Sequence, residues 1–238
     1  MVETTYSYIY MRRAMDRKGV ITLARKIWGV DSANPVNEEL YDCVRNKFGL
    51  PKYWGRHLTK HHDGSNGLTK EELSFIRGKG IKVLPIFTVI SDTLGYEAGR
   101  VSARNAVFHA RRLGIPKNTA IFANIEHLFK VDAQWIIGWV ETLLPSGYRS
   151  GFYQYPVKGE FSQAYCQAVK ENNDVAANAI LWSAEPESGT TSERKAPRYN
   201  PITPNCKANV WVWQYGRNAK NCGINTNLAD DRVLSPLN

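Results

Sequence analysis

The stretch Thr119-Ala-Ile-Phe-Ala-Asn-Ile-Glu-His127 decides the fold that we expect for this chain. It begins with apolar and β-branched residues and ends in two polar side chains, Asn124 and Glu126, which predicts a buried strand. Residues two apart in a strand point to the same side, so Asn124 and Glu126 share one space and Ile125 faces the other way. Polar groups at the carboxyl end of an apolar strand are typical of parallel α/β sheets and barrels.

Strand and helix patterns alternate on both sides of this stretch. We expect strands over residues 26–31, 52–57, 81–90, 119–127 and 148–155, and each is followed by a helical pattern. Further strands are expected over residues 179–184, 210–215 and 224–228, with no clear helix between the first two. The pattern predicts an α/β fold, an irregular TIM-like barrel of about five βα units followed by three strands. Thr69 and Glu72 stand in capping-box register at the start of the second helix.

The length of 238 residues suits one large domain, which we place at residues 27–238, with residues 1–26 as an N-terminal extension. No apolar run approaches the length that crosses a bilayer. The first residues lack the apolar segment and cleavage site of a secretory signal, so we expect no export signal in the chain as given. Its localisation stays open.

The formal charge of +9 and the pI near 9.4 favour a polyanionic neighbourhood. Nucleic acid, an acidic membrane face and an anionic cell-wall polymer all meet that description. The lysines and arginines are scattered and form no long basic run, so nucleic-acid binding is the least favoured of these partners.

The four cysteines, Cys43, Cys166, Cys206 and Cys222, show neither CxxC pairs nor zinc-finger spacing. We expect free buried thiols, with a bridge between Cys206 and Cys222 as the alternative.

The histidines His57, His61 and His62, beside Asp63, raise the question of a metal site. The loop Gly64-Ser-Asn-Gly67 that follows argues against the helix that would align them, so we expect a solvated polar loop and no metal. The chain also lacks a nucleotide-binding glycine loop, a GxSxG motif and a Cys-His nucleophile signature, and we therefore expect no cofactor.

Polar and aromatic residues gather at or near the carboxyl ends of the expected strands, where barrel enzymes place their working residues. They are Asp31, Asp92, Asn124, Glu126, Tyr153, Trp182, Gln214 and Asn225. Any one carboxylate among them could be only a salt-bridge partner. Together with Trp182 and Trp213 they predict a sugar site, in which aromatic faces stack on pyranose rings and carboxylates act on the glycosidic oxygen.

Glycosidic cleavage needs a protonated acid at the leaving oxygen and usually a second carboxylate. We assign Glu126 as the general acid, because an apolar strand end raises the pKa of a carboxyl group. Asp31 is the best supporting carboxylate, with Asp92 and Glu185 behind it. Asn124 can donate a hydrogen bond to a substrate acetamide, but it cannot offer a negative charge to a developing cation.

Several motifs, in their order, resemble a bacterial glycoside-hydrolase-like family that is related to the family-25 lysozymes. The resemblance covers about residues 27 to 230 and is carried by Trp28-Gly-Val-Asp31, Tyr53-Trp-Gly-Arg-His-Leu-Thr59, Gly67-Leu-Thr-Lys-Glu-Glu-Leu73, Gly80-Ile-Lys-Val-Leu-Pro-Ile-Phe87, Ala110-Arg-Arg-Leu-Gly-Ile-Pro116, Gly147-Tyr-Arg-Ser-Gly-Phe-Tyr153, Leu181-Trp182 and Val212-Trp-Gln-Tyr215. It implies an irregular β/α barrel with a sugar-binding groove at the strand carboxyl ends and, as in the lysozymes, hydrolysis of the peptidoglycan glycan.

The resemblance also implies roles for single residues. The acid on the first strand of the lysozymes is matched by Asp31, and their Asp-x-Glu is matched by Asn124-Ile-Glu126. Their late Asp is matched by Asn225 and Asn227, so two acids of the pattern are amides in this chain.

Three hypotheses follow. The first is a glycosidase acting on cell-wall glycan, with Glu126 and Asp31 as catalytic residues. The second is a non-catalytic glycan-binding module that uses the same groove, and the third is nucleic-acid binding through the basic surface. The expected substrate-binding residues are Asn124, Asp92, Arg56, Tyr153, Trp182, Gln214, Tyr215 and Asn225. The oligomeric state is left open.

Overall fold

The computed structural model describes residues 14–15, 21–22, 24–60, 64, 66–89, 93–125 and 129–234. Two short strands, β1 (Ala14–Met15) and β2 (Ile21–Thr22), pair with each other near the amino terminus. The main body is a closed barrel of eight strands. In chain order they are β3 (Lys26–Asp31), β4 (Tyr53–His57), β5 (Lys82–Thr88), β6 (Ala120–Asn124), β7 (Arg149–Gln154), β8 (Ile180–Ala184), β9 (Asn209–Ala219) and β10 (Ile224–Asp230).

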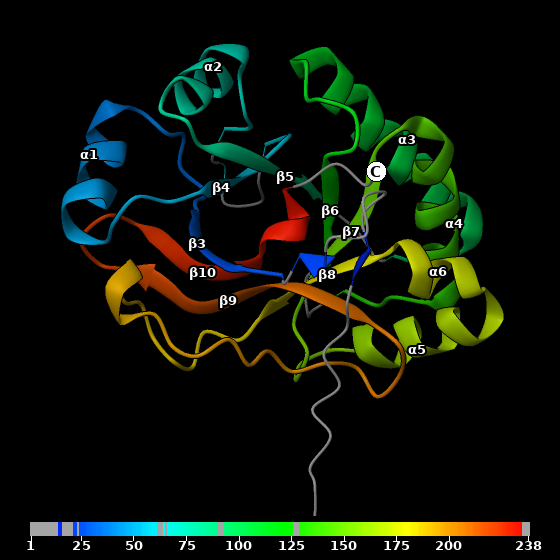
Figure 1. The fold of residues 1–238 in the computed structure, drawn as a ribbon. Coiled ribbons are helices and arrows are strands. Elements are labelled where there is room, and N and C mark those ends of the chain that lie inside the picture. Colours follow the sequence, from blue (N-terminus) through cyan, green and yellow to red (C-terminus); the bar gives the residue numbers. More distant parts are fainter. Residues whose placement is uncertain are drawn as a thin grey trace, which may run out of the picture.

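The barrel is irregular because its last strand runs against its neighbours. Strands β3 to β9 follow one another as parallel neighbours, whereas β10 pairs antiparallel with both β9 and β3 and closes the ring (Figure 1). The expected irregular TIM-like α/β barrel, five βα units and then three strands, is therefore confirmed.

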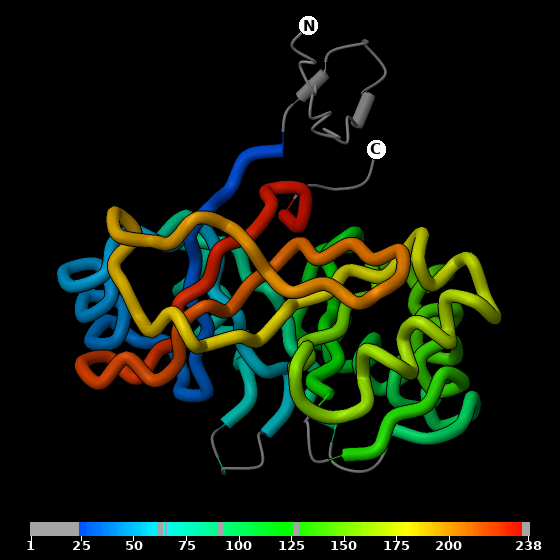
Figure 2. Tube along the Cα trace, turned by 90° about the horizontal axis from the view of Figure 1, so that it is seen from below, coloured from blue at the N-terminus to red at the C-terminus, as the bar shows by residue number. Residues whose placement is uncertain are grey.

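The helices lie outside the ring of strands (Figure 1). They are α1 (Glu38–Lys47), α2 (Lys70–Gly78), α3 (Tyr96–Leu113), α4 (Ala133–Leu143), α5 (Phe161–Glu171) and α6 (Asn173–Asn178), of which the sequence patterns missed α6. A long loop, residues 185–208, joins β8 to β9 and crosses the outer face of the barrel (Figure 2). Its Tyr199 ring meets the Trp213 ring edge-on. It contains only the short 3-10 helix Glu193–Lys195.

The start of α2 follows its expected cap in part. The Thr69 hydroxyl accepts a hydrogen bond from the Glu72 backbone amide at 3.1 Å, as the capping-box register predicts. The Glu72 side chain does not complete the box. It accepts instead from the Val36 amide and from the Arg56 guanidinium, so the helix start is tied to the strand layer.

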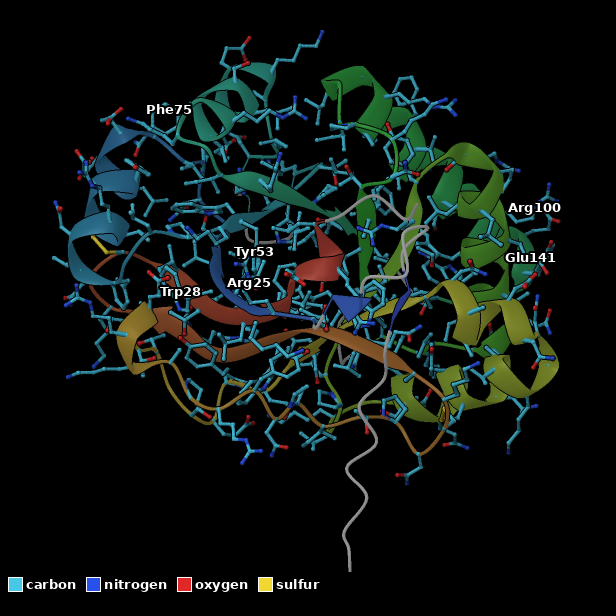
Figure 3. All side chains as sticks on the ribbon, viewed as in Figure 1. Arg25, Trp28, Tyr53, Phe75, Arg100 and Glu141 are labelled. Carbon is cyan, nitrogen blue, oxygen red and sulfur yellow. A yellow bond between two sulfur atoms is a disulfide. The ribbon has the colours of Figure 1, made fainter. Side chains whose placement is uncertain are left out.

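Two apolar layers fill the molecule. One lies between strands and helices, and the other fills the inside of the barrel with side chains such as Tyr53, Phe122 and Trp182. Figure 3 shows Tyr53 within the ring of strands and Arg100 and Glu141 on the helical rim. The alternation along β6 is as expected, because Phe122 faces the interior while Ile125 belongs to the outer layer.

Gly55 makes the crowded interior possible. A Cβ atom at this position would lie 2.6 Å from the Trp182 ring and 2.7 Å from the Cβ atom of Asp31. The indole and the first-strand carboxylate can therefore pack against β4 only because this residue has no side chain.

Both expectations for the cysteines, free buried thiols or a Cys206–Cys222 bridge, are wrong. They form two disulfides, Cys43–Cys222 and Cys166–Cys206, so they are neither free thiols nor a Cys206–Cys222 pair. The first joins α1 to the turn between β9 and β10, and the second joins α5 to the segment before β9. Barrel closure brings together residues 179 positions apart in the chain, which spacing alone does not reveal.

Among the residues that the structure describes, no helix has the length and apolarity needed to span a membrane.

A buried ion pair holds β4 to α2, and it gives a stability prediction. Arg56 Nε lies 2.6 Å from Glu72 Oε1, and both side chains are almost fully buried. The Glu72→Gln substitution leaves the guanidinium without a counter-charge, and we expect it to lower the free energy of unfolding by about 3 to 5 kcal/mol in urea denaturation. The exposed neighbour Glu71, changed to Gln, is the matched control and should shift stability far less. Equal effects of the two substitutions would contradict this assignment.

Candidate functional site

The site begins with the carboxylate of Asp31 at the carboxyl end of β3. The residue is 6% exposed, and three amide side chains donate to it. Asn227 Nδ2 lies 2.7 Å and Gln214 Nε2 3.1 Å from Oδ1, and Asn225 Nδ2 lies 2.8 Å from Oδ2. The carboxylate is therefore fixed in position by three neutral donors.

The antiparallel closing strand explains this arrangement. In the ladder between β10 and β3, Asn225 stands directly opposite Asp31, and Asn227 follows two residues later on the same face. Gln214 comes from the adjacent β9. The three amides thus meet the carboxylate only where the barrel closes.

Each of the three side-chain amides is oriented by a hydrogen bond that its own oxygen accepts. Trp182 Nε1 donates to Asn227 Oδ1 at 3.0 Å, Arg217 donates to Gln214 Oε1, and the Asn218 backbone amide donates to Asn225 Oδ1 at 3.0 Å. Because each amide oxygen is occupied in this way, each NH₂ group is turned toward the carboxylate.

Burial raises the pKa of the Asp31 carboxyl above its ordinary value. The hydrogen bonds from Asn227, Asn225 and Gln214 and the positive charge of Arg217 restrain that rise. Burial, and then the nearby Asp31 charge, raise the pKa of the Tyr153 phenol well above its ordinary value. Tyr153 therefore stays a neutral hydrogen-bonding group beside the carboxylate.

A pocket of about 130 Å³ opens beside Asp31 at this end of the barrel. Its lining residues come from β3, β4, β5, β6, β7 and β10 and the segment after β3, namely Asp31, Ala33, His57, Ile86, Asn124, Tyr153 and Asn225. The pocket brings together four of the expected site residues, namely Asp31, Asn124, Tyr153 and Asn225. Gln214 does not line the pocket but donates a hydrogen bond to the Asp31 carboxylate.

The tryptophans do not form the expected stacking platform. Trp182 is fully buried inside the barrel, where its ring packs against Tyr53, Phe122 and Tyr153. Trp213 belongs to the outer layer. Neither ring lines the pocket, because Trp182 lies buried inside the barrel and Trp213 packs in the outer layer.

Two other expected substrate contacts, Arg56 and Tyr215, also lie away from the pocket lining. Arg56 is completely buried, and its five donors bond to Glu72 and to the carbonyls of Ser32, Ala33 and Asn66. The hydroxyl of Tyr215 accepts from Trp28 Nε1 at 2.9 Å in the outer layer. Both residues hold the scaffold together and do not line the pocket.

Glu185, the reserve carboxylate, is tied to the long loop. It accepts hydrogen bonds from the Ser183 hydroxyl and, at 2.9 Å, from the Ile202 backbone amide. Burial raises the pKa of its carboxyl. Glu185 does not line the pocket. Its hydrogen bond from the Ile202 amide anchors the long loop that covers β9.

The predicted roles of Glu126, Asp92, His61, His62 and Asp63 fall outside the described residues. Those roles stay predictions. Within the described part of the chain, no group of three His, Cys, Asp or Glu side chains is placed to hold a metal ion.

Sequence reasoning missed two residues of the site. His57 lines the pocket, with its Nδ1 atom 2.9 Å from the Thr88 hydroxyl. Its position two residues after Gly55 on β4 could have placed it on the inward face. Arg217 contacts Gln214 and Tyr153 from the end of β9, but β9 was expected to end earlier, at Tyr215.

The sequence of the chain also matches a known protein family. The model of the Rv2525c-like, glycoside hydrolase-like domain matches residues 51–224. No curated protein matches the chain.

Several solved structures are similar to the chain. An uncharacterized protein of B. stearothermophilus shares 59% sequence identity with a TM-score of 0.85, over 87% of this chain and 98% of that one. The catalytic domain of an endolysin from a Listeria monocytogenes bacteriophage shares 12% identity with a TM-score of 0.56, over 88% and 96% of the two chains. A family GH25 lysozyme from Aspergillus fumigatus shares 10% identity with a TM-score of 0.53, over 87% and 94%. The last two similarities concern the fold alone.

The raised pKa of Asp31 predicts a pH dependence of stability. The native state holds the Asp31 proton more tightly than the unfolded state, so stability falls as pH rises from the ordinary value of 3.8 through the raised native pKa. The Asp31→Asn variant lacks this dependence. Relative to the variant, the wild-type protein should lose at most about 1.4 kcal/mol per pH unit in that window.

Urea unfolding of both proteins in small pH steps between 4 and 8 measures the difference. A difference that stays constant over this range would show that the native structure does not raise the pKa of Asp31.

Proposed function

This chain belongs to the Rv2525c-like, glycoside hydrolase-like family, and we propose that it is a glycoside hydrolase that acts on a cell-wall glycan of the peptidoglycan type. The observation that carries the proposal is the buried, amide-held Asp31 carboxylate beside a pocket at the carboxyl ends of the barrel strands. Barrel enzymes bring substrate to this end of the sheet.

In this proposal Glu126 is the general acid. It stands two residues after Asn124, which ends β6 and lines the pocket. A protonated carboxyl group there would donate its proton to the leaving glycosidic oxygen. Asn124 would donate a hydrogen bond to the acetamide of an N-acetylated sugar, which would fix the sugar ring beside the acid.

Asp31 supplies the negative charge that the reaction needs. As the glycosidic bond breaks, positive charge develops on the sugar ring, and a fixed carboxylate nearby stabilises it. The three amides hold Asp31 in place before the reaction, so it need not reorganise. None of the three carries a positive charge, so they position the carboxylate without pairing with it.

A glycan-binding module is the second candidate, and a specific observation favours it. Neutral amides stand at Asn124, Asn225 and Asn227, and the last two occupy the Asp31 carboxylate with hydrogen bonds. A site of this kind can bind sugar hydroxyls through Asp31 and the amides without cleaving the glycosidic bond. Nucleic-acid binding has only the net charge of +9 in its favour and is the weakest candidate.

The proposal predicts strong losses of activity at two carboxyl groups. On purified peptidoglycan, Glu126→Gln and Asp31→Asn should each lower the release of new reducing ends by about a hundredfold or more. Glu71→Gln, on the exposed face of α2, is the control and should leave the rate unchanged.

A wild-type rate no higher than that of Glu126→Gln throughout pH 4 to 8 would contradict hydrolysis. Saturable binding of wall fragments under the same conditions would then support the binding module.

A further inference from the structure

Arg217 is a cation at the edge of the site, and in the proposed hydrolysis it serves only to orient Gln214. It stands near the carboxyl end of β9 and is half-buried. Its backbone neighbour Asn218 donates to Asn225, a pocket residue, so Arg217 lies next to the rim of the pocket.

Neutral groups hold the guanidinium in place. Nε and Nη2 donate to Gln214 Oε1 at 3.3 and 3.2 Å, and Nη2 lies 3.5 Å from the Tyr153 hydroxyl. The guanidinium carbon lies 5.1 Å from the centre of the Tyr155 ring, within the range of a cation–π contact. The side chain is therefore oriented on three sides by an amide and two phenols.

Buried and half-buried arginines of the described chain differ in their partners. Arg56 pairs with a carboxylate and Arg149 donates to three backbone carbonyls. Arg217 is held by neutral side chains and forms no ion pair with a described carboxylate. The nearest charge that the structure connects to it is Asp31, which it reaches only through the Gln214 amide. The positive charge of Arg217 therefore has no direct anionic partner among the described residues and can attract an anionic group of a ligand.

We propose that Arg217 binds a carboxylate carried by the sugar in the Asp31 pocket, and so selects acidic sugars from neutral ones. The inference rests on the proposed function only in taking that pocket as the glycan site. Nε and Nη2 are taken by Gln214 and Tyr153, so Nη1 is the nitrogen that would donate to the anion, and the Tyr155 ring keeps the plane of the guanidinium fixed. The contacting groups of Gln214, Tyr153 and Tyr155 add no second cation, which suits the single charge of a carboxylate better than the double charge of a phosphate.

A purely structural role is the competing explanation, because Arg217 also orients Gln214 and through it Asp31. Loss of that role would weaken the binding of every sugar equally. Loss of an anion contact would weaken only the binding of the charged sugar. The ratio of the affinity for the charged sugar to the affinity for the neutral sugar therefore distinguishes an anion contact from a purely structural role.

The experiment compares oligosaccharides of equal length by calorimetry on the whole chain. One is a neutral N-acetylglucosamine oligomer, and the second alternates N-acetylglucosamine with peptide-free N-acetylmuramic acid, which carries a free lactyl carboxylate. The third is the methyl ester of the second, which removes the charge and little else. We expect the wild-type protein to bind the free acid about tenfold or more tightly than either neutral sugar.

Three variants complete the test. Arg217→Gln removes the charge and should bring the ratio of the affinity for the charged sugar to the affinity for the neutral sugars close to one, whatever common loss it causes in both affinities. Arg217→Lys should retain part of the ratio, because it keeps the charge and loses the planar fork. Arg104→Gln, an exposed arginine on α3, makes the same change of net charge and should leave the ratio as in the wild type.

The contrary outcomes are distinct. Equal binding of charged and neutral sugars by the wild type, or a ratio unchanged in Arg217→Gln, overturns the role of Arg217 and leaves the glycan site standing. Failure of the wild type to bind any of the sugars overturns both. An oligomer in which glucuronic acid replaces the muramic acid shows which of the two acidic sugars the site prefers.

Discussion

The contact between Asp31 and its three amide donors is the constraint on which the rest of the structure depends. It lies at the seam where β10 joins β3 and β9, so the side chains that complete the barrel are also those that hold the charge. Each donor is in turn fixed by a group from the surrounding structure, including the buried Trp182 indole. A residue that was expected to stack on sugar thus serves the site from inside the core.

The same seam explains how the interior and the pocket share one space. Gly55 lets the Trp182 ring approach β4 while Asp31 stands directly beside it. Large apolar and aromatic side chains such as Phe122 and Trp182 fill the barrel below this level, whereas the pocket above it is lined by polar side chains together with Ala33 and Ile86. Depth along the barrel axis therefore decides whether an inward side chain is core or site.

Much of the fold could be predicted from local patterns, because period-two alternation and helix caps are written in neighbouring residues. The strand around Phe122 and the Thr69 cap are examples. The depth of a side chain along the barrel axis and the contacts made where the barrel closes depend on residues far apart in the chain. The sequence does not show that Trp182 lies below the mouth of the barrel, or that Cys43 forms a disulfide with Cys222.

The site residues Asp31, Asn124, Tyr153 and Asn225 were predictable as a group, because all four lie at the carboxyl ends of strands or pair with such an end. Arg56 was misjudged because its neighbours Gly55 and His57 take the inward face of β4, which turns it outward to Glu72.

The central claim is that the Asp31 pocket receives a sugar. A crystal structure of the Glu126→Gln variant with a peptidoglycan disaccharide tests it most directly. The account predicts a sugar ring in the pocket, with one of its hydroxyl or acetamide groups within hydrogen-bonding distance of Asp31 Oδ2 or Asn124. A disaccharide bound elsewhere on the barrel, with this pocket filled only by water, would contradict it.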